Sequence, residues 1–246
     1  MIPPFETTFA VPLSCEDCIK DVSTSLYKLD GIQHVSASLK NQLISITGTA
    51  APSTIVAAIQ DTGRDAILRG SGKAESAAVC ILETHSSAVS EYVRGLIRMV
   101  QVSPTMTLLD VTLKGVSPGS YNISIRERGD ISLGPESTGS VWDYLDAQKA
   151  SPPRLAKGVL GTVEVGRSGI GAVFLDKPIQ IWEMIGRSVV VSRRGNTEKH
   201  DREDPDTLVG VIARSAGVWD NDKTVCSCSG KTVWEERKEQ QGRGML

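Results

Sequence analysis

The period of the hydrophobic pattern changes once along this chain, near residue 70, and the change limits the folds that the chain can adopt. Before it, strand-like alternation and helix-like spacing follow one another. After it, the helical period disappears, and short strand-like runs separated by turn residues continue to about residue 217. The length of 246 residues leaves room for two ordinary domains. We therefore expect a mixed domain over residues 1–71, an all-β domain over 72–217 and a flexible tail over 218–246.

The first domain is expected to have the ferredoxin-like βαββαβ order. The expected elements are a strand over 5–11, a helix from Cys18 to Gly31, a hairpin over 35–46, a helix from Pro52 to Gly63 and a strand over 65–70. This order of elements is that of the split βαβ unit.

The second domain is expected to be an antiparallel sandwich or Greek-key barrel. Strand-like runs occur at 78–82, 96–102, 108–113, 121–127, 186–191 and 207–213. Several such strands separated by turn residues are typical of this architecture. The stretch 142–178 contains glycines, prolines and weak strand signals, and we expect it to form loops on the barrel.

Four of the five cysteines form two close pairs, Cys15 with Cys18 and Cys226 with Cys228, while Cys80 lies in an apolar run that predicts a buried, inert thiol. No secretory signal is visible, and no apolar run is long enough to span a bilayer. The formal net charge of −2 gives no support for binding to nucleic acid or to a membrane surface. We therefore expect a reducing, cytoplasmic location, where close cysteine pairs indicate metal or redox chemistry more often than structural disulfides.

The first pair sits where a helix is expected to begin, with Cys15 in the preceding loop and Cys18 in the first turn. A helix N-terminus lowers a thiol pKa, and two soft thiolates favour Cu(I) or Zn(II). A thioredoxin-like redox pair is the alternative, which this short βαββ alternation fits poorly. Cys226 and Cys228 are too close for an unstrained disulfide, so they suit disulfide exchange or a soft metal.

Residues 5–70 resemble the heavy-metal-associated domain of copper chaperones and copper-pumping ATPases. The usual Met-x-Cys-x-x-Cys motif reads Leu13-Ser14-Cys15-Glu16-Asp17-Cys18 here. The resemblance implies that Leu13, in place of Met, packs inward and is not a ligand. Arg64 could lie close enough to offset the charge of a bis-thiolate Cu(I) complex, or it could be a solvated surface residue, which is the interpretation we favour.

The middle segment resembles copper–zinc superoxide dismutase. The matching stretches are Ser120–Gly139, Gly186–Val191 and Gly210–Ile212. The resemblance places copper-binding histidine positions on Ser124, Arg126 and Ser192, and the cysteines of the internal disulfide on Pro135 and Val209. These residues cannot form the metal centre of an active dismutase. The resemblance therefore implies a barrel that has kept its shape without the enzyme's chemistry.

The face used for dimerisation in that family remains a candidate docking surface. By resemblance it comprises Gly129, Asp130, Trp182, Ile185, Gly186, Val211 and Arg214. We expect it to pair with a real dismutase subunit, with Trp182 as an anchor. The alternative is that Trp182 is an ordinary core residue.

In its order of segments, the whole chain resembles the copper chaperones for superoxide dismutase, in their fungal form. The resemblance implies a chain that is not an enzyme in the usual sense, that carries Cu(I), and that forms a heterodimer with copper–zinc superoxide dismutase. Cys226 and Cys228 would deliver copper and promote the enzyme's internal disulfide, an oxidoreductase-like step. It also implies a homodimer when alone and a minor fraction in the mitochondrial intermembrane space. A metal-free thiol–disulfide oxidoreductase, an active dismutase and a homodimeric copper buffer stay open as alternatives.

Overall fold

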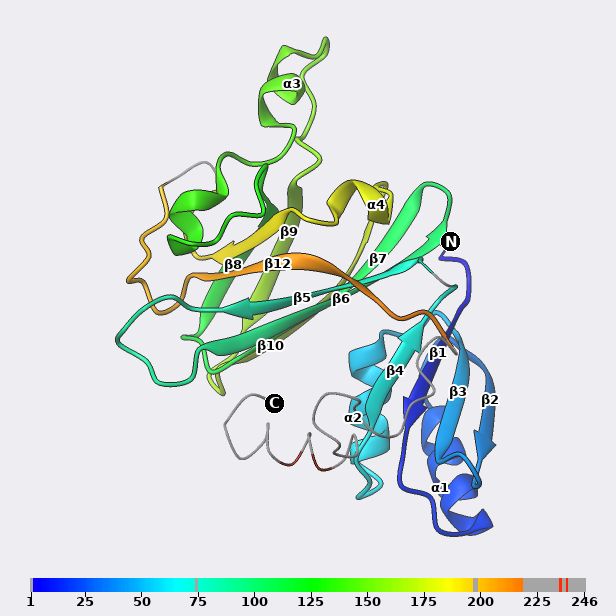
Figure 1. Ribbon diagram of the computed structural model, residues 1–246. Coiled ribbons are helices and arrows are strands. Elements are labelled where there is room, and N and C mark those ends of the chain that lie inside the picture. The colour runs from blue at the N-terminus through cyan, green and yellow to red at the C-terminus, as the bar shows by residue number, and fades with distance from the viewer. Residues whose placement is uncertain (1, 74, 197–198, 219–234, 236–237, 239–246) are drawn as a thin grey trace.

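The N-terminal domain is a four-stranded sheet against which two helices pack (Figure 1). The computed structural model describes residues 2–73, 75–196, 199–218, 235 and 238, so Cys226, Cys228 and most of the expected tail lie outside the described residues. The sheet has the order β2-β3-β1-β4. Its elements are β1 (Phe5–Ala10), α1 (Glu16–Leu26), β2 (Ile32–Ser38), β3 (Leu43–Gly48), α2 (Pro52–Gln60) and β4 (Ile67–Ser71). The expected βαββαβ order is confirmed.

The helices of this domain form where apolar residues recur on one face. In α1, Val22 and Leu26 are fully buried and join a core that includes Phe9 of β1 and Ile44 of β3. Gly31 follows this helix with a φ of +87°, in the left-handed region that a glycine adopts without steric cost. Val22 and Leu26 lie in the C-terminal half of α1. The N-terminal end of the helix, with Cys15 and Cys18, stays at the surface.

The second domain is a closed barrel of eight antiparallel strands in the order β10-β7-β6-β5-β12-β11-β8-β9. The strands are β5 (Ala77–Glu83), β6 (Val93–Ser103), β7 (Met106–Lys114), β8 (Gly119–Ile125), β9 (Val159–Val165), β10 (Ile170–Lys177), β11 (Ser188–Ser192) and β12 (Leu208–Ser215). A 3-10 helix over Gly134–Thr138 and the short helices α3 (Tyr144–Lys149) and α4 (Ile181–Met184) lie in its connections. The barrel architecture expected from the sequence is confirmed.

The prediction of loops throughout residues 142–178 is wrong, because this stretch contains α3, β9 and β10. β10 pairs with β7 along its whole length, from Ile170 with Lys114 to Lys177 with Thr107. β9 pairs with β8, and its Gly161 has a φ of +137° near an irregularity in the register. Glycines weaken the local strand signal, and the pairing that forms these strands comes from residues far away in the sequence.

The two domains are joined along a seam of apolar and backbone contacts. Phe5 of β1 packs with Val100 and Leu108 of the barrel. Beyond β12, Val218 donates a backbone hydrogen bond to Gly72 at 2.8 Å. A Cβ atom on Gly70 would lie 2.1 Å from the carbonyl oxygen of Gly217, so the close approach of these segments requires glycine at position 70. The segment that precedes the tail therefore runs beside the edge strand β4.

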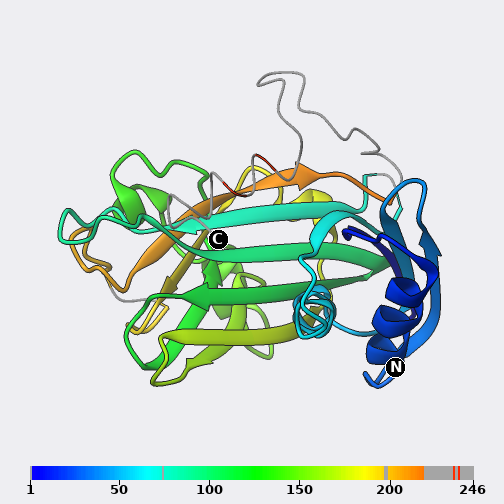
Figure 2. The same ribbon diagram turned by 90° about the horizontal axis from the view of Figure 1, so that it is seen from below.

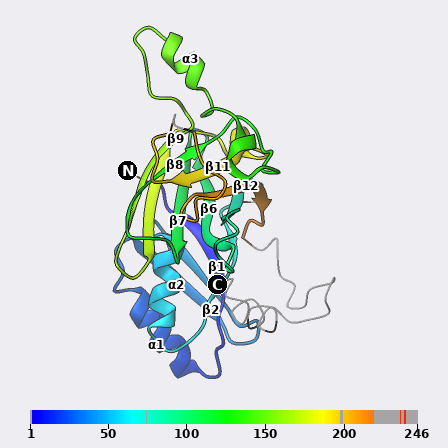
Figure 3. The same ribbon diagram turned by 90° about the vertical axis from the view of Figure 1, so that its left-hand side faces the viewer.

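The seam places the N-terminal domain at one end of the barrel. Figure 2 shows the barrel strands running side by side toward this domain, and Figure 3 shows α3 projecting at the opposite end of the molecule from α1 and α2. Among the described residues, no helix has the length and apolar character needed to cross a membrane.

Candidate metal site and docking surface

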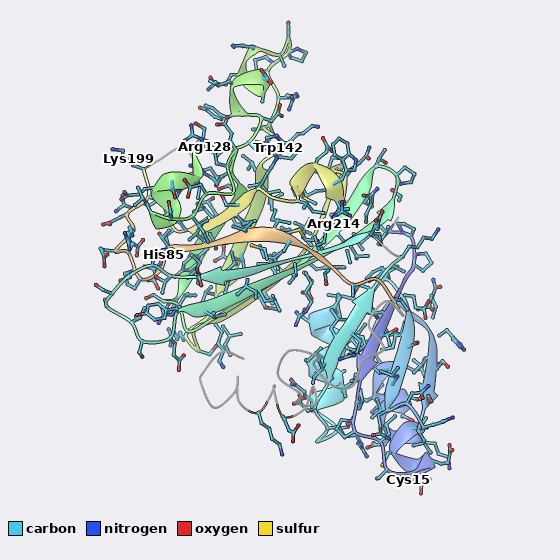
Figure 4. All side chains as sticks on the ribbon, in the orientation of Figure 1. Cys15, His85, Arg128, Trp142, Lys199 and Arg214 are labelled. Carbon is cyan, nitrogen blue, oxygen red and sulfur yellow. The ribbon has the colours of Figure 1, made fainter. Side chains whose placement is uncertain are left out.

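Cys15 and Cys18 meet at the N-terminal end of α1. Cys15 is the N-cap residue, with an extended backbone, and Cys18 lies in the first turn. Their Sγ atoms are 3.1 Å apart, with Cys15 exposed and Cys18 partly buried. Figure 4 shows Cys15 at the end of the N-terminal domain that is remote from the barrel. The expected juxtaposition of the two thiols at a helix start is confirmed.

The surroundings of Cys18 favour its thiolate. Hydrogen bonding with the Ser14 hydroxyl, 3.2 Å away, is the largest of several causes that lower the pKa of Cys18 to about 6. The neighbouring Cys15 and the side chain of Arg64 lower it further. The start of a helix also favours a negative charge at this point. At neutral pH the site therefore presents the Cys18 sulfur as a thiolate.

Arg64 belongs to this site, so the interpretation that it is merely solvated is wrong. Its side chain is 20% exposed, and it donates a hydrogen bond to Asp21 at 2.7 Å. The interaction with Cys18 and the pair with Asp21 raise the pKa of Arg64. The sequence shows an arginine 46 residues beyond Cys18, but the turn that brings it back to α1 depends on how the two helices pack.

The inward-facing position before the cysteines is confirmed for Leu13. Its side chain is 4% exposed and lies in the core of the N-terminal domain. Cys80 is fully buried in β5, and burial raises the pKa of its thiol to about 12, which makes it a poor nucleophile. The candidate ligands Cys226 and Cys228 lie outside the described residues.

In the barrel, the positions that the resemblance to dismutase assigns to copper-binding histidines carry other residues, whose side chains form hydrogen bonds within the protein. Arg126 is buried, and its guanidinium donates to the carbonyl oxygen of Gly139 at 3.1 and 2.8 Å and to that of Asn196 at 2.8 Å. Ser192 is buried and lies 3.0 Å from the hydroxyl of Thr207. Within the described part of the chain, no group of three or more His, Cys, Asp or Glu residues could hold a metal ion. An internal cation and a hydroxyl pair occupy these positions instead.

Three residues of the candidate docking surface lie next to one another. A Cβ atom on Gly129 would be 2.1 Å from the carbonyl oxygen of Gly186 and 3.7 Å from Val211. Gly186 in turn donates its N–H to Ile212 of β12 at 2.9 Å. Asp130, Gly186 and Arg214 are exposed, while Ile185 packs against the barrel core. The structure thus brings the loop before the 3-10 helix, the end of α4 and β12 onto one surface.

Trp182 is 65% exposed, so the alternative of a core tryptophan is wrong. Its Nε1 donates to Gln180 at 2.6 Å. The next residue of α4, Glu183, forms an ion pair with Lys157 at 2.7 Å. Arg187 lies 4.5 Å from the centroid of the Trp142 ring, a cation–π geometry that sequence reasoning did not identify. These contacts hold α4 in place while the indole of Trp182 faces solvent.

Known proteins match both domains and the full length of the chain. Residues 8–65 match the heavy-metal-associated domain family, and residues 93–216 match the copper/zinc superoxide dismutase family. "Superoxide dismutase 1 copper chaperone" of Debaryomyces hansenii is 43% identical over all of this chain and 99% of the relative. The protein of the same name from Saccharomyces cerevisiae is 42% identical over 96% of this chain and 95% of the relative. The chain belongs to the copper chaperones for superoxide dismutase.

The chain also has relatives outside the fungi. "Copper chaperone for superoxide dismutase" of Mus musculus is 32% identical over 93% of this chain and 88% of the relative. Membership of this family classifies the chain as a chaperone and not as an enzyme. This chaperone combines the surface thiols of Cys15 and Cys18 with a dismutase-like barrel in which other residues stand at the positions of the copper-binding histidines.

Proposed function

We propose that this chain carries Cu(I) on Cys15 and Cys18 and delivers it to copper–zinc superoxide dismutase. The observation that carries the proposal is the exposed thiol pair at the start of α1, in which the pKa of Cys18 is lowered to about 6. Two thiolates hold a soft ion and leave its remaining coordination open to an incoming ligand. Arg64 beside Cys18 would offset the negative charge of the complex.

The barrel supplies docking in this proposal. The exposed Trp182, with Gly129, Gly186 and Val211 beside one another, forms a surface that a dismutase subunit would contact, giving a heterodimer. The names of the relatives support dismutase as the partner. Pairing of two copies through the same surface would give the homodimer expected when the chain is alone.

Cys226 and Cys228 would act on the partner. In the disulfide step, a dismutase thiolate attacks the Cys226–Cys228 disulfide and forms a mixed disulfide. The second dismutase thiolate then displaces the tail sulfur, so two electrons pass to the tail and leave Cys226 and Cys228 as thiols. An oxidant such as dioxygen must restore the tail disulfide.

We also propose that the tail pair receives copper from the first pair. Cys226 lies eight residues beyond Val218, which spans roughly 27 Å when extended. Val218 is bonded to Gly72 at the seam, and the six residues of β1 cover roughly 20 Å from the seam toward the cysteine loop. The two lengths are similar, which supports transfer of copper from Cys15 and Cys18 to the tail within one chain.

The test is activation of copper-free, reduced dismutase by the chain and three variants, with and without dioxygen. We expect the Cys226→Ser/Cys228→Ser variant and a truncation at Val218 to abolish activation. The Cys15→Ser/Cys18→Ser variant should fail mainly when copper is scarce. The opposite ranking would show that the roles of the two pairs are reversed, and full activation by every variant would refute the proposal.

A further inference from the structure

Gln42 ties the turn between β2 and β3 to the loop that carries the cysteines. Its Nε2 donates to the carbonyl oxygens of Leu13 at 2.5 Å and of Leu39 at 2.8 Å. Its Oε1 accepts the N–H of Leu13 at 2.6 Å. The side-chain amide therefore pairs with both backbone groups of Leu13, as a neighbouring strand would. In addition, the backbone carbonyl of Gln42 accepts the N–H of Val11 at 3.0 Å.

The backbone of Gln42 indicates that this side chain has a specific use. Its φ of +55° lies in the left-handed region, where glycine and asparagine are the favoured residues. A non-glycine residue held there suggests a role for its side chain. Asparagine is one methylene shorter, so at the same backbone position it would not place its amide where that of Gln42 lies. The length of the glutamine side chain is what joins the turn to Leu13.

Leu13 stands two residues before Cys15, the N-cap residue of α1. The Leu13 side chain is buried in the core, and Gln42 holds the peptide groups on both sides of its Cα. These contacts fix the loop immediately before the thiol pair. A site whose ligands are already placed loses less conformational freedom when the metal binds.

We propose that Gln42 is a positioning residue of the Cys15–Cys18 copper site. It contacts neither sulfur, and it acts by holding the backbone of Leu13 so that Cys15 and Cys18 face each other before the ion arrives. The inference rests on the proposed function, because copper is taken to be the ion that Cys15 and Cys18 bind. Groups behind the ligands of a metal site commonly change its affinity by about 10-fold to 100-fold.

The first test is Gln42→Gly in the full-length, reduced chain with Cys226→Ser and Cys228→Ser in the background, so that the tail pair does not bind Cu(I). Glycine relieves the left-handed backbone but loses the three side-chain hydrogen bonds of Gln42; these effects oppose each other, so the melting temperature should change little. The affinity for Cu(I), measured anaerobically by competition with a chromophoric Cu(I) chelator, should fall about 10-fold. Asn41→Gly is the matched control, because Asn41 is the exposed neighbour in the same turn, and its affinity should be unchanged. An unchanged affinity in Gln42→Gly would overturn the proposal.

A second variant and a metal-free measurement separate this proposal from the proposed function. Gln42→Glu keeps the shape and an acceptor but loses the Nε2 donors, and it should also weaken Cu(I) binding. In the metal-free protein, exchange of the Leu13 amide hydrogen should accelerate in Gln42→Gly, which removes the acceptor of that N–H, and should stay slow in Gln42→Glu, which keeps it. Unaltered Leu13 exchange in Gln42→Gly would overturn positioning by Gln42. Wild-type Cu(I) binding that survives Cys15→Ser/Cys18→Ser would instead refute copper binding at this pair.

Discussion

Asp110 of the barrel caps helix α2 of the N-terminal domain by binding Ser53 in its first turn. The helix has no side-chain cap of its own. The N-cap residue Ala51 has no side-chain hydrogen-bond group, while Asp110 accepts the N–H of Ser53 at 2.8 Å and its hydroxyl at 2.6 Å. The Asp110 carboxylate is 2% exposed and lies 3.5 Å from Arg98. Because an acidic group at a helix N-terminus stabilises the helix, this contact links the folding of the two domains.

We therefore predict that Asp110→Ala loosens the N-terminal domain from the barrel. The substitution leaves the Ser53 N–H without its acceptor and removes one ion-pair partner of Arg98, so we expect a loss of about 1–3 kcal/mol in the free energy of unfolding. Calorimetry should show the two domains unfolding in more clearly separate transitions. Asp176→Ala, an exposed acidic residue on β10, is the control and should resemble wild type. Equal profiles for both variants would contradict this role of Asp110.

Alkylation of the reduced, metal-free protein should be fastest at Cys18 and should depend on pH. Because hydrogen bonding from Ser14 lowers the pKa of Cys18 to about 6, its reaction with iodoacetamide should reach half its maximal rate near pH 6. Because the pKa of Cys18 is lower in the folded chain than in the unfolded chain, the stability of the fold depends on pH through this thiol. The thiolate stabilises the fold above the unfolded pKa, near 8.5, and this contribution is lost as pH falls through about 6.

Ser14→Ala and Cys80 provide the controls for this experiment. Removing the Ser14 hydroxyl should move the alkylation midpoint of Cys18 upward, toward the ordinary thiol pKa. Cys80 is buried, with its pKa raised to about 12, and should react only when the protein unfolds. Peptide mass spectrometry assigns each site. A midpoint for Cys18 that does not move in Ser14→Ala would show that the hydroxyl is not the cause.

Arg126→Ala should destabilise the barrel without producing a metal centre. The substitution removes three hydrogen bonds and leaves the carbonyl groups of Gly139 and Asn196 without this partner. We expect a loss of about 2–4 kcal/mol, measured by urea unfolding. Arg128→Ala, at an exposed arginine two residues further on, should change stability by less than about 0.5 kcal/mol. Superoxide turnover after copper loading should be absent in both, and its appearance would contradict the loss of ligands.

Sequence reasoning identified what local pattern encodes. The spacing of Val22 and Leu26 predicted α1, and the cysteine motif placed Cys18 in its first turn. It did not identify β9 and β10, where Gly161 interrupts the alternation and pairing with β8 and β7 stabilises the strands. Nor could it identify contacts such as Gln42 with Leu13 or Asp110 with Ser53. They join residues 29 and 57 positions apart, and no sequence period signals them.

Trp182 should be the main anchor of the docking surface. Its indole is 65% exposed on α4, four residues before Gly186, and burial of such a side chain at the centre of an interface commonly contributes about 2 kcal/mol. Trp182→Ala should therefore weaken binding to copper-free, reduced dismutase about 30-fold, measured by calorimetric titration. Val211→Glu, which places a charge on the same surface, should weaken it further.

Ile170→Ala is the matched control for this surface. Ile170 is also an exposed large apolar residue, but it lies on β10, four strands from β12 around the closed barrel. We expect wild-type affinity for this variant, since a partner that covers Trp182 and Val211 does not reach β10. If Ile170→Ala weakens binding as much as Trp182→Ala does, or if Trp182→Ala binds normally, the dismutase docks on another part of the molecule. In that case this surface resembles the dimer face of a dismutase but does not bind the enzyme.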